Sequence, residues 1–529
     1  MLYYLRNNRK VLIKMKKIFA LVICLLLLLT GCSTSNVKQE ISGVKINLSD
    51  NKITVDGSKI TNDNTAAVYS ANDIVFYKDG QDFTYGEGTK DDEHPQSEAD
   101  SHTVVHIAKP GTYVLSGKLS SGQIAVDLGS DAKSDSSAVV TLVLNNADIT
   151  CTVAPAVIFY NVYECGDKTE ENATKDVDTS KAGANVIIAD DSVNTINGSY
   201  VARIYDPETV QLNDDKTEVT DADKLHKYDA AFYSKRTMNV SGGQQGNGVL
   251  NINAENEGLD SELHLTINGG IINITSGNDG INTNEDNVSV TTVNGGELNI
   301  LCNGKTGEGD GIDSNGWLVI NGGIVTAQAC ATSGDAGIDS DKGIYINGGK
   351  VVASGNMLDR IAGGEQTYAV FNFTTRQVGD STYTLKNKDN KAVGEYAPTN
   401  DFTYLLIAGE ELEPGEYTFW QGDTQLAAMS GGNMGERPQM PGDGTQPPQM
   451  PEGENFDPNQ IPQMPQGERP DGEIPEQPNG EMLQGERPQF PGGMGDMGMT
   501  NGESTTTFTI VKGGNQFSNV APAPTTQTE

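Results

Sequence analysis

The sequence is poor in cysteine, histidine and aromatic residues. Its 529 residues include six Cys, five His and two Trp, and aromatic residues make up 6% of the chain. Hydrophobic residues reach only 36%, while glycine occurs 61 times. This composition is unlike that of a helical enzyme and is typical of a turn-rich β protein with long polar stretches. The length allows two or three domains.

Positive charge is also scarce. The chain has 36 Lys and Arg against 72 Asp and Glu, a net charge of −36. Residues 1–31 hold six basic and no acidic residues, so the chain without them carries −42. Such a surface repels phosphate backbones, which argues against nucleic acid as a partner. It also repels acidic polysaccharides unless metal cations intervene.

The first 31 residues have the features of a secretory signal peptide. Lys16 and Lys17 precede an apolar run, residues 18–29, that is short for a membrane-spanning helix of about 20 residues. The following Leu-Thr-Gly-Cys32-Ser resembles a bacterial lipobox. By that resemblance Cys32 is lipidated and anchors an extracellular protein to the bacterial cell membrane. An ordinary signal followed by a chance cysteine is the alternative.

The other cysteines give no motif. No Cys-x-x-Cys pair occurs, so neither a zinc site nor a redox motif is indicated. Export permits disulfides among the four cysteines beyond Cys32, and buried free thiols are an equal alternative. These four are Cys151, Cys165, Cys302 and Cys330.

An internal repeat is the strongest signal in the sequence. The tripeptide Asn-Gly-Gly recurs at intervals of 26, 27 and 26 residues, beginning at Asn268, Asn294, Asn321 and Asn347. A second motif recurs in step with it, as Glu257-Gly-Leu-Asp260, Asp279-Gly-Ile-Asn282, Asp310-Gly-Ile-Asp313 and Ala336-Gly-Ile-Asp339. Two motifs in step predict stacked structural repeats.

Each repeat reads as about three short strands without a helix. Apolar residues alternate with polar ones on both sides of each glycine turn, as in Ile272 and Ile274 or Leu298 and Ile300. One such coil cannot bury its apolar face alone, whereas stacked coils can. We therefore predict an all-β protein whose residues 103–365 form a right-handed parallel β-helix. A propeller blade needs about 40 residues, and the leucine-rich repeat pattern is absent.

The rest of the chain divides by composition. Residues 32–102 are predicted to be an N-terminal linker with short strands, and residues 366–429 a C-terminal β cap that protects the open edge of the last coil. Residues 430–502 hold 13 of the 21 prolines and 8 of the 13 methionines, and are expected to be a disordered insertion. Residues 503–529 complete the chain with a final strand and a tail.

A family resemblance rests on these motifs. The segment Ala-Ala-Phe-Tyr-Ser-Lys at residues 230–235, with the recurring Gly-Ile-Asp-Ser and Ile-Asn-Gly-Gly, resembles a bacterial carbohydrate-binding β-helix family. The resemblance covers roughly residues 100–425. It implies a fold similar to that of pectate lyases, bound calcium, and cellulose or pectate as the polysaccharide partner. The chain departs from the pattern at Asn282 and Ala336, and carries an insertion around residues 206–223.

The acidic residues of the second motif are the candidate calcium ligands. Equivalent positions of stacked coils lie about 4.8 Å apart, and two carboxylates at that distance repel by about 3.5 kcal/mol at an effective dielectric of 20. Hard oxygen ligands favour Ca²⁺. Asp260, Asn282, Asp313 and Asp339 flank an inward apolar residue and are expected to point outward. The alternative is that these residues only form turns. The predicted ligands are Glu257, Asp260, Asp279, Asp310, Asp313, Asp335 and Asp339.

Three aromatic side chains are candidates for carbohydrate binding. The alternation places Trp317 and Tyr345 on the outer face, and His264 shares the column of Trp317. A flat exposed ring can stack on a pyranose. Packing against a neighbouring segment is the alternative.

No catalytic residue is assigned. A pectate-type lyase uses a strong base, usually an arginine, and no arginine lies between Arg236 and Arg360. We therefore expect a non-catalytic, calcium-dependent polysaccharide-binding surface lipoprotein. A polysaccharide lyase or hydrolase on the same fold is the main alternative, because fold alone does not decide activity. An adhesin or structural surface protein is the second.

Overall fold

The computed structural model describes residues 42–431 and 504–524. The predicted signal peptide, Cys32 and nearly all of the Pro/Met-rich tract therefore lie outside the described residues. All but three of the described residues belong to one unit, residues 45–529. The described part is all-β, with helix only at α2 (Gln96–Ala99), η1 (Ser130–Ser134) and η2 (Glu170–Asn172). No helix within it is both long and apolar enough to cross a membrane.

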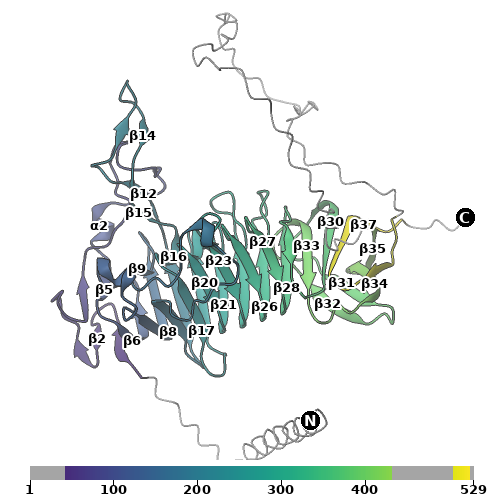
Figure 1. Cartoon of the computed structure of the whole chain (residues 1–529), viewed down its shortest axis with the longest axis horizontal. Helices are drawn as coiled ribbons and strands as arrows, with labels where there is room; N and C mark the ends of the chain where they lie inside the picture. Colours follow the sequence, from purple (N-terminus) through teal and green to yellow (C-terminus); the bar gives the residue numbers. More distant parts are fainter. Residues whose placement is uncertain (1–41, 432–503, 525–529) are drawn as a thin grey trace, which may run out of the picture. The chain divides into compact units, whose positions relative to one another are not determined.

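Three ladders of mainly parallel strands form the centre of the fold (Figure 1). The first contains β10 (Ala184–Ile188), β17 (Met238–Gly242), β20 (His264–Ile267), β23 (Val290–Val293), β25 (Trp317–Ile320), β27 (Gly343–Ile346) and β29 (Ile361–Gly363). The second contains β11 (Val193–Gly198), β18 (Val249–Ala254), β21 (Ile271–Ser276), β24 (Glu297–Cys302), β26 (Ile324–Gln328) and β28 (Lys350–Gly355). The long strand β8 (Val140–Cys151) pairs with β6 (Gly111–Leu119) and contributes to both ladders.

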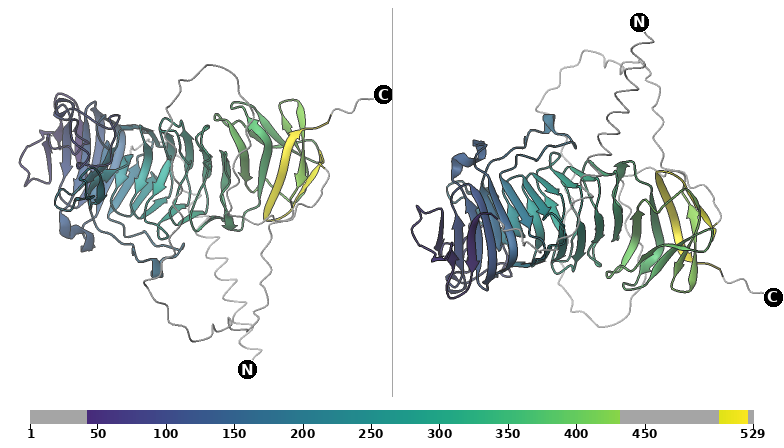
Figure 2. Two further views of the ribbon diagram at one scale, coloured as in Figure 1. Left: turned by 90° about the horizontal axis from the view of Figure 1, so that it is seen from above. Right: turned by 90° about the horizontal axis from the view of Figure 1, so that it is seen from below.

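The third ladder forms a separate seven-stranded sheet. Its members are β5 (Thr103–Ile107), β7 (Gly122–Asp127), β9 (Val157–Asn161), β16 (Ala230–Ser234), β19 (Glu257–Ser261) and β22 (Ile281–Thr283), with β4 (Val68–Ala71) antiparallel at its edge. Single bridges continue the ladder from Ile281 to Ile312 and from Ile312 to Ile338. Figure 2 shows the strands of neighbouring repeats side by side from two further directions.

The period-two alternation seen in the sequence corresponds to burial. In β21 and β24 every second side chain is buried, as the sequence predicted. Equivalent residues of successive repeats pair directly, so Ile274 lies opposite Ile300 and Ile300 opposite Ala327. Their side chains form continuous buried columns, which explains why one repeat alone cannot supply a core.

The Asn-Gly-Gly turns align in one column, as predicted. The side-chain amide of Asn294 donates to Oδ1 of Asn268 at 2.9 Å, and Asn321 and Asn347 continue the series at 2.9 and 2.8 Å. The second glycine of each turn has a positive φ, for example +91° at Gly296. That conformation is costly for any residue with a Cβ, which accounts for the glycine at this position.

Replacing Gly296 with alanine is expected to destabilise the protein more than the same change at Gly129. Both residues have φ +91°, but a Cβ at Gly296 would lie 2.6 Å from the backbone oxygen of Gly270, whereas one at Gly129 meets nothing within 4 Å. The conformation alone costs about 1–2 kcal/mol, and the clash adds about 1–3 kcal/mol. Urea denaturation measures the difference. Equal losses would show that close stacking of the turns does not matter.

Antiparallel strands follow the last repeat. They are β30 (Tyr368–Gln377), β31 (Tyr383–Asn387), β32 (Ala392–Tyr396), β33 (Phe402–Ala408), β34 (Gly415–Gln421), β35 (Thr424–Ser430), β36 (Phe508–Ile510) and β37 (Gly514–Pro522). β33 pairs with β28, so the edge of the second ladder is covered. β35 pairs with β37, and β36, the first strand after the Pro/Met-rich tract, pairs with β34. Stacked aromatic rings, including Phe371 and Phe419, fill this core.

Two connections extend from the ladders. The insertion before β16 contains two small antiparallel pairs, β12 (Val201–Tyr205) with β15 (Lys224–Tyr228) and β13 (Gln211–Leu212) with β14 (Val219–Asp221). Residues 162–183 join β9 to β10 and are called the strap below. The N-terminal strands β1 (Val44–Leu48), β2 (Thr54–Val55) and β3 (Ser58–Lys59) pair with one another in sequence order, and β1 also pairs with β6.

Candidate functional site

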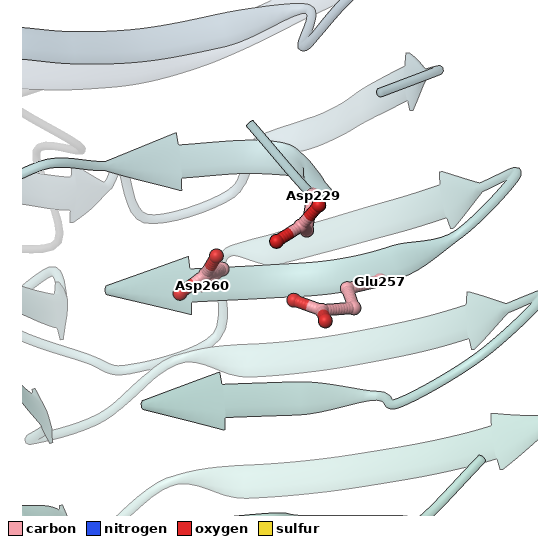
Figure 3. Close-up of side chains that lie close together, drawn as sticks. All are labelled: Asp229, Glu257 and Asp260. Atoms are coloured by element: carbon pink, nitrogen blue, oxygen red, sulfur yellow. The ribbon is translucent and has the colours of Figure 1, made fainter. Parts of the chain in front are cut away.

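Three buried carboxylates meet in the third ladder (Figure 3). Asp229 lies just before β16, and Glu257 and Asp260 lie within β19, the strand that pairs with β16 in the third ladder. Parallel pairing sets Ala230 opposite Glu257 and Tyr233 opposite Asp260, which brings the three side chains together. One oxygen of each carboxylate lies within 4.8 Å of the other two. We call these three residues the acidic triad.

Polar neighbours satisfy part of the triad. Lys227 Nζ lies 2.7 Å from Oδ2 of Asp229. The amide of Asn282 donates to Oε1 of Glu257 at 3.1 Å, and that of Asn284 donates to both oxygens of Asp260 at 3.0 Å. Oε2 of Glu257 and Oδ1 of Asn282 are buried and have no hydrogen-bond partner. One oxygen acceptor of the triad and one beside it thus lack a partner.

Burial and mutual repulsion disfavour the ionised triad. Burial and the charge of Asp260 hold the pKa of Glu257 well above its ordinary value. Burial and the charge of Asp229 do the same to the pKa of Asp260, and burial also raises the pKa of Asp229. When all three carboxylates are ionised, the single Lys227 ammonium leaves two negative charges unbalanced. A buried charge that lacks a partner is strongly unfavourable, so the site must take up protons or a cation.

The donor set fits a hard divalent cation. Ca²⁺ takes six to eight oxygen ligands, and the triad with Asn282 Oδ1 supplies at least four. The two unbalanced charges match those of one divalent ion. No sulfur or imidazole ligand belongs to this set, which disfavours softer metals. Asp229, Glu257, Asp260 and Asn282 are therefore the residues that would hold calcium here.

The remaining predicted ligands lie elsewhere. Three of them accept hydrogen bonds from backbone N–H groups of neighbouring repeats. The N–H of Asp310 donates to Asp279 at 2.7 Å, and that of Ala336 donates to the Asp310 carboxylate at 2.6 Å. The N–H of Gly309 donates to Asp335 at 2.5 Å. These bonds give all three a role in forming the turns. Among the described residues only the acidic triad brings three possible ligand groups together. Of the seven predicted ligands, the structure therefore joins two, Glu257 and Asp260.

The column of the second motif has the predicted register but not the predicted exposure. Asp260 pairs with Asn282, and the isoleucine bridges continue the column to Asp313 and Asp339. Asp260, expected to point outward into solvent, is 0% exposed. That expectation is wrong because Asn284 donates to its carboxylate and the carboxylates of Asp229 and Glu257 lie beside it. Asp313 and Asp339 are partly exposed.

The aromatic candidates differ in their surroundings. His264 shares the column of Trp317 through Val290, but it is only 3% exposed. The prediction of an exposed ring is wrong, because Gly166 of the strap lies directly against it. Burial accordingly lowers the pKa of His264 to about 4. Trp317 is partly exposed, as is Tyr345, whose ring has the ammonium of Lys175 5.2 Å from its centroid.

Sequence reasoning missed Asp229, Lys227 and Asn284. An alignment of residues 229–234 with residues 256–261 would have placed Asp229 one position before the acidic position of the motif. Lys227 comes from the insertion, which has no counterpart in the repeat, so no pattern could indicate it. The cysteines Cys151, Cys165, Cys302 and Cys330 are free thiols, and all but Cys165 are buried.

The chain belongs to the family of carbohydrate-binding domain-containing proteins, whose family model matches residues 101–390. The matched segment is more than half of the 529 residues and contains all strands of the three ladders except β4. A solved structure described as the polysaccharide lyase-like protein from C. thermocellum, in a gadolinium derivative, is 18% identical, with a TM-score of 0.30. The match covers 61% of this chain and 99% of that chain. No curated protein matches the chain.

Proposed function

We propose that this protein is a non-catalytic, calcium-dependent polysaccharide-binding lipoprotein of the bacterial cell surface. The three ladders would form a right-handed parallel β-helix, and Cys32 would carry the lipid anchor. Membership of a carbohydrate-binding family supports the choice of ligand class. Parallel pairing at one strand per repeat supports the β-helix, and the lipobox-like residues before Cys32 support the anchor.

The acidic triad carries the calcium part of this proposal. One ammonium group, that of Lys227, pairs with one of its three buried carboxylates, and Oε2 of Glu257 and Oδ1 of Asn282 lack a partner. Bound calcium would neutralise the remaining charge and link β16, β19 and β22, since Asn282 belongs to β22. We propose that this link holds successive repeats in register.

The proposed glycans are of the plant cell-wall type, cellulose or pectate. Pectate is a polyanion, and the chain without its first 31 residues carries −42. The two repel each other unless a divalent cation lies between a sugar carboxylate and a partly exposed aspartate such as Asp313 or Asp339. Cellulose has no charge, and its binding would depend on hydroxyl and ring contacts instead.

A polysaccharide lyase is the second candidate function. The observation that favours it is the position of Lys235, which follows β16 and has its ammonium 5.5 Å from the ring centroid of Tyr228. Burial lowers the pKa of this lysine, and a less basic lysine can serve as a proton acceptor.

A glycan pull-down tests the proposal. The purified protein, without residues 1–32, is mixed with insoluble cellulose or with polygalacturonate that is covalently cross-linked. Each mixture is prepared once with calcium and once with chelator. We expect binding to polygalacturonate only in calcium, weakening as salt is added. Ultraviolet absorbance of the supernatant reports unsaturated uronides, and we expect none. Chelator-resistant binding to polygalacturonate would refute the calcium requirement, and unsaturated products would establish the lyase.

A further inference from the structure

A polar groove runs beneath the strap, on the outer face of the first ladder. Its volume is about 490 Å³, and residues 175–180 of the strap form one wall. The floor comes from successive repeats, with Asn239, Thr266, Thr292 and Val319 in one column and the Asn-Gly-Gly asparagines in the next. We propose that this groove binds an uncharged glycan chain. The inference rests on the proposed polysaccharide-binding function and assigns it a place.

The asparagine column offers regularly spaced hydrogen-bonding groups. Asn268, Asn294, Asn321 and Asn347 are all exposed. Each link of the column uses one N–H of one amide and one lone pair of the next. An amide has two N–H donors and an oxygen with two lone pairs, so the central members keep one donor and one acceptor free. A sugar hydroxyl, which both donates and accepts, matches that pair.

A buried acceptor at one end of the groove lacks a partner. Asn239 is 8% exposed, and its Oδ1 has no hydrogen bond. Its amide nitrogen is occupied, because it donates to the backbone oxygen of Thr179 at 2.8 Å and to Asn185 Oδ1 at 3.1 Å. Buried polar atoms without partners are rare and costly. A ligand hydroxyl that donates to Oδ1 of Asn239 would remove this cost.

The strap is fixed to the ladders at several points. Thr179 Oγ1 lies 2.8 Å from Thr266 Oγ1, which closes the groove at its Asn239 end. Lys168 Nζ lies 2.6 Å from Glu285, and Glu170 lies 3.6 Å from Lys342 Nζ. These contacts reach β20, the segment after β22 and the start of β27, so the strap crosses several repeats. A long connection held in this way is typical of a functional loop.

The charges around the groove favour a neutral ligand. No charged side chain contributes to the floor among the residues that line it. On the strap, Lys175 Nζ lies 2.7 Å from Asp176, so its charge is compensated. Asp178, also in the wall, adds a negative charge that repels uronates. Successive repeats lie about 4.8 Å apart, so the column presents roughly one asparagine amide per sugar unit of an extended glycan chain.

The test compares two asparagine columns of the same repeats. Asn294→Ala removes two links of the column in the groove. Asn273→Ala removes two equivalent links in the second ladder, where Asn273 donates to Asn251 and accepts from Asn299. The change at Asn273 therefore controls for the loss of stability. Ser180→Arg, on the exposed strap, fills the groove without altering the ladders and serves if Asn294→Ala does not fold.

Isothermal titration of the folded proteins with cellohexaose gives the result. We expect Asn294→Ala and Ser180→Arg each to weaken binding roughly tenfold, with Asn273→Ala within about twofold of the wild type. Equal affinity in all variants would overturn the proposal that the groove binds the glycan, but not the proposed polysaccharide-binding function. If the wild-type protein bound polygalacturonate in calcium but did not bind cellohexaose, the groove proposal would also be overturned. Absence of binding to any glycan would refute the proposed function as well.

Discussion

Replacing Glu257 with glutamine is expected to remove most of the stabilisation that calcium gives the protein. A ligand that binds only the folded state stabilises it by about 2.7 kcal/mol at a hundred times its dissociation constant. With an unfolding entropy of about 2.1 cal/mol/K per residue over about 400 described residues, that is a rise in melting temperature of roughly 3 °C. Glutamine keeps the size of Glu257 and the acceptor for Asn282, but lacks the charge that a cation needs.

The same variant should behave almost like the wild type in chelator. Burial and Asp260 raise the pKa of Glu257 well above its ordinary value, so without a cation its surroundings favour the protonated carboxyl group, which resembles an amide. Glu297→Gln is the matched control, because it removes one partly exposed carboxylate from β24, outside the triad. Scanning calorimetry with and without calcium measures both. Equal destabilisation of Glu257→Gln in the two buffers would assign Glu257 a purely structural role.

The calcium-free protein is expected to lose stability as the pH rises from 5 to 8. Burial, with the nearby Asp341, raises the pKa of Asp313 to about 6. Burial, with Asp359, raises the pKa of Asp339 to about 7, and burial, with Asp279, raises that of Asp310 to about 9. In the unfolded chain such groups ionise near pH 4. Their contribution to stability is therefore complete below pH 4 and is lost as the pH rises through each folded-state pKa.

Between pH 5 and 8 the free energy of unfolding is expected to fall by at least about 3 kcal/mol, after a discount for the partial exposure of Asp339. The melting temperature in chelator should therefore fall by at least roughly 3 °C. Asp310→Asn should weaken the dependence of stability on pH, because asparagine does not titrate. It retains the acceptor for the N–H of Ala336, so the hydrogen bond is kept. A melting temperature in chelator that rises over this range would contradict these pKa shifts.

The repeats were predictable because their determinants are local. The second glycine of each Asn-Gly-Gly adopts a positive φ that the residue type itself permits, and apolar residues at every second position face the core. Strands with the same pattern at the same interval can pair only in register if each is to bury its apolar face. The alignment of Asn268 with Asn294 and of Asp260 with Asn282 follows from this repetition.

The side-chain environment was predictable only in part. The sequence indicated Glu257 and Asp260 as ligands, but also five acidic residues that the structure does not bring into one site. The difference arises because the carboxylates of Asp279, Asp310 and Asp335 bond to the backbone of neighbouring repeats. Such bonds depend on the relative position of two turns, which a repeat pattern does not specify.

By itself, the sequence determined the all-β class, the length of the repeat and the columns in which equivalent residues lie, because these follow from residue type and spacing. Only the tertiary structure decided which columns are covered. The insertion brings Lys227 against Asp229, and the strap brings Gly166 against His264 and Thr179 against Thr266. These contacts join residues 2 to about 100 positions apart through irregular connections, whose course depends on the surface beneath them rather than on any period in the chain.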